Sequence, residues 1–96
     1  MYYLYILKCA DGTLYTGMTT NPKRRVSEHN TSDRGAKYTR TRRPVKLVYA
    51  KRFHNRSNAG KAEARIKRLS RREKLRLVSG YHGARLLLFD KTYPLE

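Results

Sequence analysis

Apolar and aromatic residues gather at the start of the chain in a pattern that predicts a β-hairpin. Residues 2–9 contain aromatic and aliphatic side chains without a breaker, which is typical of a strand. Ala10, Asp11 and Gly12 follow as turn residues, and residues 13–18 predict the returning strand. This hairpin is the first part of the predicted fold.

The pattern continues with a helix, a loop and a third strand. Asn21 can cap a helix over about residues 22–30, because the proline at its first position needs no hydrogen-bond acceptor there. Residues 31–43 lack a periodic pattern and predict a mobile basic loop. Residues 44–53 place apolar side chains at every second position from Val45, so they predict a third strand with Pro44 as its first residue.

Two further helices are expected after the third strand. Ser57 can cap the first of them, and Ser70 with Glu73 forms a capping box for the second, which Gly80 ends. The apolar positions of the first helix recur with the helical period: Ala59, Ala62, Ile66 and Leu69. The expected fold class is therefore α+β, a small three-stranded antiparallel sheet flanked by helices in the order ββαβαα.

The chain divides into one domain and a short extension. Residues 1–80 carry all the predicted elements, and at this length only one small core can form. Residues 81–96 form a C-terminal extension that we expect to pack on the same domain. Their apolar run, residues 86–89, fits either a helix or a strand.

Charge narrows the class of partner. The 96 residues include 23 Lys and Arg against 7 Asp and Glu, a formal net charge of +16, which predicts a polyanion such as nucleic acid as partner. The longest apolar run is far too short to span a membrane, so no membrane insertion is expected. Cys9 is the single cysteine and the chain start lacks the order of a secretory signal, which favours a cytoplasmic, nucleoid-associated protein.

Motifs for several chemistries are missing from the sequence. It contains no phosphate-binding glycine loop, no Cys or His pair at zinc spacing and no Ser-His-Asp set. We therefore expect neither a nucleotide cofactor nor zinc.

Glu63 stands out among the few carboxylates. In a helical projection it lies about 40° from Ala59 and about 60° from Ile66, at the edge of the apolar face and directed toward the sheet. A carboxylate there needs either an arginine partner or a divalent cation, and the sequence leaves both readings open.

Two polar residues share the inward face of the first helix. Arg25 and His29 are four residues apart and therefore neighbours on that face. They are either structural or parts of a phosphate site, in which Arg25 would contact phosphate oxygens and His29 would relay a proton.

The two tyrosines of the hairpin share a face only under one turn geometry. A three-residue turn with Gly12 in the left-handed conformation places Tyr15 opposite Leu7 and Tyr5 diagonal to Tyr15. A two-residue turn would put Tyr5 and Tyr15 on opposite faces, where they would only pack.

These residues together resemble the signature of the GIY-YIG nucleases. The matching positions are Tyr3-Leu4-Tyr5, Tyr15-Thr16-Gly17, Arg25-Val26, His29 and, within Ala62-Glu63-Ala64-Arg65-Ile66-Lys67, the glutamate helix. The similarity spans nearly the whole chain and is greatest to the short stand-alone GIY-YIG domain proteins of bacteria. Residues 1–80 would then be a GIY-YIG-like nuclease domain.

The resemblance implies a metal-dependent endonuclease or nickase that hydrolyses DNA, on branched or damaged DNA since no base-reading module is present. Tyr15 would activate the water, Tyr5 would support it, Arg25 would stabilise the phosphate and His29 would assist proton transfer. Glu63 would hold one Mg²⁺ or Mn²⁺. The basic residues expected to contact DNA are Lys23, Arg24, Arg34, Lys37, Arg40, Arg42, Arg43 and Lys67.

The sequence departs from the family pattern at three places. Tyr3 replaces a glycine of the first triplet, Met18 stands where several members have lysine, and no asparagine follows Asn58. Lys67 or Lys74 would have to replace that asparagine. These departures keep one alternative open, a non-catalytic nucleic-acid-binding module on the same scaffold. The positive charge and tyrosines available for base stacking keep a second open, a basic RNA-binding or ribosome-associated protein. No protein partner is indicated.

Overall fold

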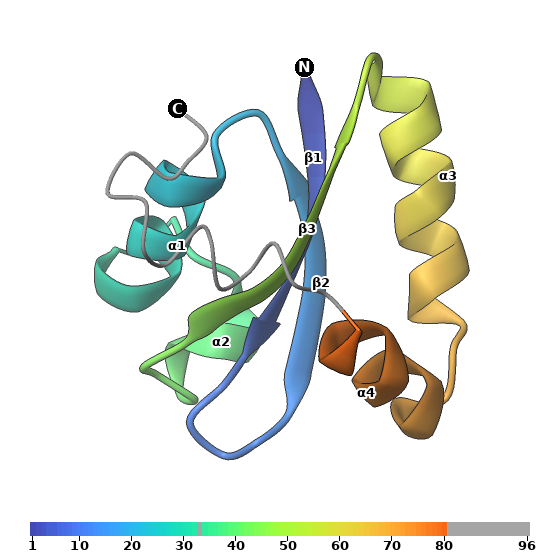
Figure 1. Ribbon diagram of the computed structural model, residues 1–96. Coiled ribbons are helices and arrows are strands. Elements are labelled where there is room, and N and C mark those ends of the chain that lie inside the picture. Colours follow the sequence, from blue (N-terminus) through green and yellow to red (C-terminus); the bar gives the residue numbers. More distant parts are fainter. Residues whose placement is uncertain (33, 81–96) are drawn as a thin grey trace.

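A three-stranded antiparallel sheet separates two layers of helices (Figure 1). The computed structural model describes residues 1–32 and 34–80, so the predicted helix or strand in residues 81–96 lies outside the described residues. Within the described part, no helix combines the length and the apolar character that crossing a membrane requires. The predicted α+β class and its three-stranded sheet are confirmed.

The first hairpin has the predicted turn. β1 spans Tyr2–Lys8 and β2 spans Leu14–Thr19. Gly12 has a φ of 86°, in the left-handed region that glycine enters without a steric penalty. Leu7 pairs with Tyr15, as the three-residue turn requires. Tyr5 and Tyr15 therefore share one face of the sheet.

The middle strand of the sheet is β1. β3 spans Lys46–Phe53 and pairs antiparallel with the other edge of β1, which gives the order β2-β1-β3. The strand begins two residues later than predicted, because Pro44 has no N–H and the backbone of Val45 is bonded elsewhere. The Asn30 side chain accepts from Val45 N at 2.7 Å and donates to Val45 O at 3.0 Å.

Helices α1 and α2 cover one face of the sheet. α1 spans Pro22–Thr31, and Asn21 caps it by accepting a hydrogen bond from Arg24 N at 3.1 Å, as predicted. α2 spans Lys37–Arg40 within the segment predicted to be a loop, so the expected absence of regular structure there is wrong for four residues. The buried Thr39 fixes this turn through its tertiary contacts, which a periodic pattern cannot reveal.

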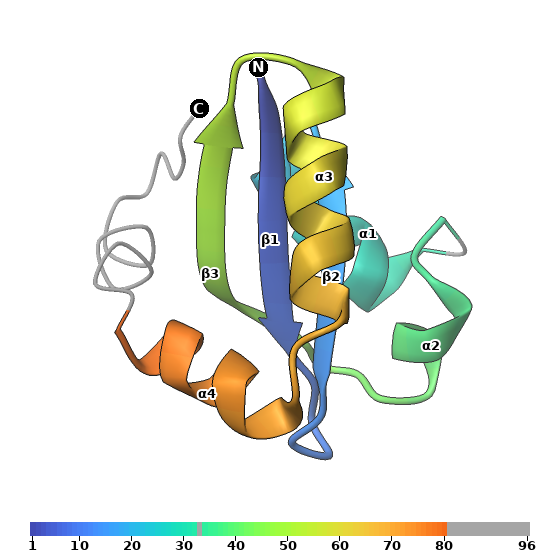
Figure 2. The ribbon, with the colours of Figure 1, turned by 90° about the vertical axis from the view of Figure 1, so that its right-hand side faces the viewer.

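Helices α3 and α4 cover the opposite face (Figure 2). α3 spans Arg56–Lys67, and its cap is Asn55, whose side chain accepts from Asn58 N at 2.8 Å. The predicted cap at Ser57 is therefore wrong: Asn55 precedes it directly after β3 and is an equally good cap. α4 spans Arg71–Ser79 and has the predicted capping box and the predicted end at Gly80.

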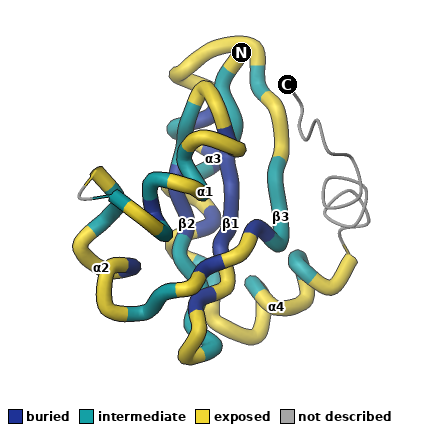
Figure 3. The backbone as a smooth tube through the Cα atoms, turned by 90° about the vertical axis from the view of Figure 1, so that its left-hand side faces the viewer, coloured by how far each residue is buried: buried dark blue, intermediate teal, exposed yellow. Residues whose placement is uncertain are grey.

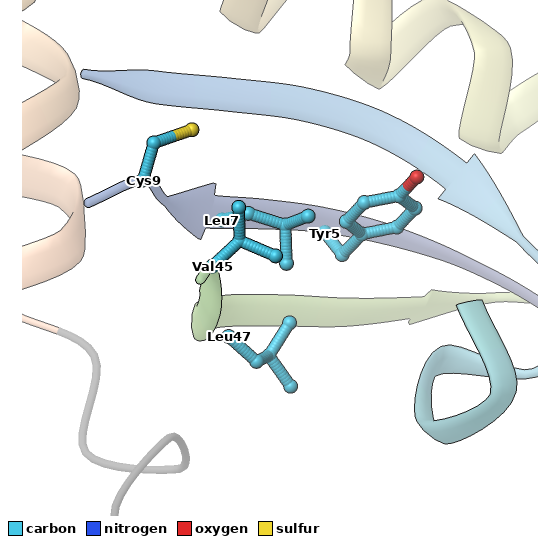
Figure 4. Close-up of a cluster of buried hydrophobic side chains, with 5 residues drawn as sticks. All are labelled: Tyr5, Leu7, Cys9, Val45 and Leu47. Atoms are coloured by element: carbon cyan, nitrogen blue, oxygen red, sulfur yellow. The ribbon is translucent and has the colours of Figure 1, made fainter. Parts of the chain in front are cut away.

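The core consists of one cluster on each face of the sheet. Figure 3 shows that β1 is the most continuously buried element, whereas most residues of α2, α3 and α4 are exposed. On the α1 side, Figure 4 shows the first cluster: Tyr5, Leu7, Cys9, Val45 and Leu47. On the α3 side, Leu4 and Ile6 pack against Ala62 and Ile66. Side chains of β1 thus alternate between the two clusters.

Candidate active site

Tyr5 reaches across the sheet through a gap that Gly17 leaves open. Tyr5 lies on β1 with 1% of its surface exposed, and Gly17 is its direct partner on β2. A Cβ atom at Gly17 would lie 2.5 Å from the Tyr5 hydroxyl oxygen, a distance that real Cβ atoms do not show. The glycine therefore allows the phenol to pass over the edge strand.

The Tyr5 hydroxyl is bonded to a buried histidine. Tyr5 Oη lies 2.9 Å from His29 Nε2, and His29 Nδ1 lies 2.8 Å from Thr39 Oγ1. The Thr39 hydroxyl also donates to the Ala36 carbonyl at 2.9 Å, and the Ala36 N–H donates to His29 Nδ1 at 3.4 Å. Both imidazole nitrogens of His29 therefore have partners, Nε2 on the Tyr5 hydroxyl and Nδ1 on Thr39 and Ala36.

Burial sets the protonation states of this pair. Burial raises the pKa of Tyr5 to about 12, although a hydrogen bond from Arg25 opposes the increase. Burial, together with the positive charge of Arg25, lowers the pKa of His29 to about 4. At neutral pH the phenol therefore keeps its proton and the imidazole is neutral, so the Tyr5–His29 hydrogen bond joins two uncharged groups.

Ring contacts fix the position of Tyr15. Its ring centroid lies 6.4 Å from that of Tyr5, 5.2 Å from that of His29 and 5.9 Å from that of Tyr38, on which it stacks. The Arg42 guanidinium covers the Tyr38 ring at 4.0 Å from its centroid. Because Tyr15 is only half-buried while Tyr5 is fully buried, Tyr15 is the phenol that a substrate can approach.

Arg25 is anchored next to the two phenols. Its Nη1 donates to the Glu28 carboxylate at 2.9 Å and to the Arg34 carbonyl at 2.7 Å. A quarter of its side chain is exposed, and its guanidinium also acts on the Tyr5 hydroxyl. The structure thus brings Tyr5, Tyr15, Arg25 and His29 together, with one positive charge beside them.

Glu63 approaches from the opposite layer of helices. Its Oε2 lies 3.2 Å from Lys67 Nζ, so its charged partner is a lysine, where the sequence left an arginine or a divalent cation open, and 23% of its side chain is exposed. Its negative charge contributes to the raised pKa of Tyr5, as the smallest of the raising causes after burial and Tyr15, while Arg25 opposes them. The carboxylate is therefore near Tyr5 in electrostatic terms although it belongs to α3.

The described residues contain no cluster of three His, Cys, Asp or Glu side chains that could hold a metal ion. A single accessible carboxylate nevertheless fits a hard ion such as Mg²⁺, which keeps several of its waters and takes few protein ligands. Glu63 meets that requirement.

The basic residues expected to contact DNA separate into two groups. Arg42 donates to Asp11 at 3.1 Å, and Arg43 bonds the carbonyl oxygens of His29 and Ser32 at the end of α1. These two arginines therefore hold the loop in place and are half-buried. The other six are exposed: Lys23, Arg24, Arg34, Lys37, Arg40 and Lys67.

Two residues of the site have no signal in the sequence. Thr39 lies in a segment without a pattern, and only the folded loop shows that it bonds His29. Tyr38 stood among arginines in the same segment, and its stacking on Tyr15 depends on α2. A buried histidine needs a partner for its second nitrogen, but the sequence does not say which residue supplies it.

Comparisons with known proteins identify the family of the chain. A family model described as the GIY-YIG catalytic domain matches residues 1–76. A UPF0213 protein of Desulfotalea psychrophila is 47% identical over 95 residues, which cover 99% of this chain and 86% of that protein. A UPF0213 protein of Syntrophus aciditrophicus is 54% identical over 76 residues, or 79% of this chain and 87% of that protein.

Solved structures show the same fold. The solution NMR structure of the UPF0213 protein BH0048 from Bacillus halodurans is 49% identical and has a TM-score of 0.54, with 82% of this chain and 84% of that chain covered. The solution NMR structure of protein EF2693 from E. faecalis is 47% identical and has a TM-score of 0.57, with coverage of 84% and 85%. The chain therefore belongs to the GIY-YIG catalytic domain family, a nuclease family, and to its UPF0213 members.

Proposed function

We propose that the protein is a metal-dependent DNA endonuclease or nickase that hydrolyses phosphodiester bonds in branched or damaged DNA. The observation that carries the proposal is the bonded series Thr39–His29–Tyr5 with Tyr15 and Arg25 beside it. A series of this kind orders a proton path next to a cation, which suits the hydrolysis of a negatively charged ester. The net charge of +16 supports a nucleic-acid substrate.

Each residue has a role that its surroundings support. Tyr15 is half-buried and activates the attacking water, while the fully buried Tyr5 supports it from the adjacent strand. His29, neutral and oriented by Thr39, takes part in proton transfer through the Tyr5 hydroxyl. Arg25 stabilises the negative charge that builds up on the phosphate.

The proposed cofactor is one Mg²⁺ or Mn²⁺ held by Glu63. When bound, such an ion supplies charge neutralisation at the phosphate and lowers the pKa of a bound water. The protein would act in the cytoplasm, associated with the nucleoid, and the six exposed cations of α1, α2, α3 and the α1–α2 loop would contact the phosphate backbone.

Cleavage by matched variants tests the proposal. Plain, nicked and branched DNA, with RNA of the same sequences, would be incubated with Mg²⁺ or Mn²⁺ and the products resolved on a denaturing gel. We expect Tyr15→Phe to lower the cleavage rate by about 10²-fold or more, as the loss of a proton-transfer group does. Glu63→Gln should abolish the metal-dependent rate, while Tyr2→Phe, a tyrosine of β1 on the opposite face, should cleave like the wild type.

Cleavage of equal rate by all four proteins would identify a contaminating nuclease and contradict the assignment. Cleavage of RNA but not of DNA would show that RNA, and not DNA, is the substrate.

A non-catalytic nucleic-acid-binding module is the second candidate, and Met18 favours it because several family members carry a lysine there. That candidate predicts tight binding with a steep salt dependence and no cleavage of any substrate. Metal-dependent cleavage that Glu63→Gln removes would exclude it.

A further inference from the structure

A second concentration of positive charge lies on and beside α4, on the face of the sheet opposite Tyr5 and His29. Four of the nine residues of α4 are Lys or Arg, and its single acidic residue is Glu73. The Glu73 carboxylate accepts a hydrogen bond from Ser70 N at 2.9 Å as part of the capping box. Among residues 1–32 and 34–80, every ion pair lies outside α4. The positive charge of this helix is therefore not neutralised by its neighbours in the described part.

Two lysines at the adjacent end of the sheet add to this charge. Lys8 ends β1, Lys46 begins β3, and the two face each other directly in the register of the strands. Like charges directly opposite on neighbouring strands destabilise a sheet. A bound anion would remove that penalty.

The end of the sheet with these lysines is the end that α4 covers. Arg71 Nη2 donates to the Gly12 carbonyl in the β1–β2 turn at 3.0 Å, and Lys8 pairs with Leu14 immediately beyond that turn. Leu14 belongs to the same apolar cluster as Leu77 of α4. We define the α4 surface by six residues: Lys8, Lys46, Arg71, Arg72, Lys74 and Arg76.

The sheet lies between the α4 surface and the tyrosines of the candidate active site. Tyr5 and His29 lie in the layer of α1 and α2, whereas α4 lies with α3 on the other face (Figures 1 and 2). Of the proposed catalytic residues, Glu63 belongs to the layer of α4. The α4 surface lies on the face opposite Tyr5 and His29, so a nucleic-acid segment there can be bound in addition to the one at the tyrosines.

We propose that the α4 surface binds the phosphate backbone of a second nucleic-acid segment, so that one molecule holds two duplexes or two arms of a branched substrate. The inference rests on the proposed function only in taking nucleic acid as the partner of the tyrosine face. We expect Lys and Arg at this surface to contact phosphates, which carry no sequence information, so the second contact should be independent of sequence. Branched nucleic acid is the substrate class in which two such segments lie close together.

A bridging experiment tests the inference without any cleavage. One short duplex is immobilised, the full chain is added without divalent ions, and capture of a second, fluorescent duplex is measured over a salt series. The α4 variant carries Arg72→Gln, Lys74→Gln and Arg76→Gln, which keeps Arg71 and its bond to Gly12. The control variant carries Arg52→Gln, Arg56→Gln and Lys61→Gln, exposed cations on β3 and α3, and has the same net charge.

We expect the wild type and the control variant to capture the second duplex. The α4 variant should capture at least about tenfold less of it while still binding the first duplex. The log–log salt slope of bridging should become shallower by roughly 3, because each lost phosphate contact removes about 0.9.

Equal capture by the α4 variant and the wild type would overturn the inference, as would equal loss in the two variants, which would mean that net charge alone matters. Bridging by a protein dimer would persist in the α4 variant and would also overturn it. The bridging assay contains no divalent ion and does not depend on cleavage. Bridging together with a lack of cleavage in the separate nuclease assay would therefore support the inference about the α4 surface and refute only the proposed activity.

Discussion

Thr39 fixes the orientation of the His29 ring in the candidate site. Its hydroxyl bonds His29 Nδ1 at 2.8 Å and the Ala36 carbonyl at 2.9 Å, which holds Nε2 against the Tyr5 hydroxyl. The residue is fully buried, so a substrate does not contact it directly. Thr39 is therefore a positioning residue, which acts on the reaction through His29.

Replacing Thr39 separates orientation from packing. Thr39→Val keeps the shape of the side chain but removes the hydroxyl that bonds His29 Nδ1, and we expect stability to fall by about 1–3 kcal/mol. The cleavage rate at saturating substrate should fall about tenfold or more, with KM little changed, and the ¹⁵N shifts of His29 should show a mixture of tautomers. Thr39→Ser restores the hydroxyl and should recover both the tautomer and most of the rate; a Ser variant as slow as the Val variant would contradict the orienting role.

Replacing glycine with alanine should have opposite effects on stability at Gly17 and at Gly60. Gly17→Ala places a methyl group against the Tyr5 phenol and should destabilise the protein by about 1–3 kcal/mol, as overpacking does. Gly60 lies inside α3 with nothing within 4 Å of an added Cβ, so Gly60→Ala should stabilise by about 0.5–1 kcal/mol. Urea unfolding of both variants measures the two changes, and a neutral Gly17→Ala would mean that Tyr5 does not cross that residue.

At the scale of elements, the start of α3 is the clearest difference between prediction and structure. Asn55 accepts from Asn58 N, whereas Ser57 lies inside the first turn of the helix. Asn55→Ala should therefore lower the free energy of unfolding by about 1 kcal/mol, and Ser57→Ala should change it by less than half of that. A larger loss of stability for Ser57→Ala than for Asn55→Ala in denaturant unfolding would instead identify Ser57 as the cap.

Local signals in the sequence predicted most elements correctly. The tight turn with Gly12, the cap at Asn21 and the capping box of Ser70 and Glu73 depend on neighbours within a few residues, and all three are confirmed. The four-residue α2 depends on Thr39, which is buried by contacts with a distant helix. Elements fixed by tertiary contacts of this kind leave no periodic signal.

The candidate site likewise contains some contacts that the sequence predicts and others that only the folded structure reveals. Arg25 and His29 are four residues apart on one helix, and a helical projection brings them together. The turn places Tyr5 and Tyr15 on one face, which the register confirms. Only three-dimensional packing shows that Tyr38 covers Tyr15 and that His29 is bonded on both nitrogens.

At the scale of the whole molecule, His29 links stability to pH. The pKa of His29 is lowered from 6.5 to about 4 in the folded protein, so between these values only the unfolded chain takes up the proton. Stability is therefore fully present above about pH 6.5 and decreases as the pH falls toward 4. The loss attributable to His29 is roughly 3 kcal/mol at about 1.4 kcal/mol per pH unit.

Urea midpoints measured from pH 7 to pH 4 test this dependence. A His29→Gln variant should start less stable but lose less stability over that range, whereas His54→Gln, at an exposed position, should follow the wild type. A His29→Gln curve parallel to that of the wild type would show that His29 is not the titrating group.

The order β2-β1-β3 has a consequence for how the protein is made. Of the three strands, the one in the middle of the sheet is synthesised first, and its second partner ends only at Phe53. The β1–β2 hairpin can form locally, but one edge of β1 stays unpaired until β3 has been synthesised, and its α3-side apolar face stays uncovered until α3 has been synthesised. A nascent chain of this protein therefore exposes its most hydrophobic strand for longer than a protein whose central strand is made last, and it needs protection from aggregation during that interval.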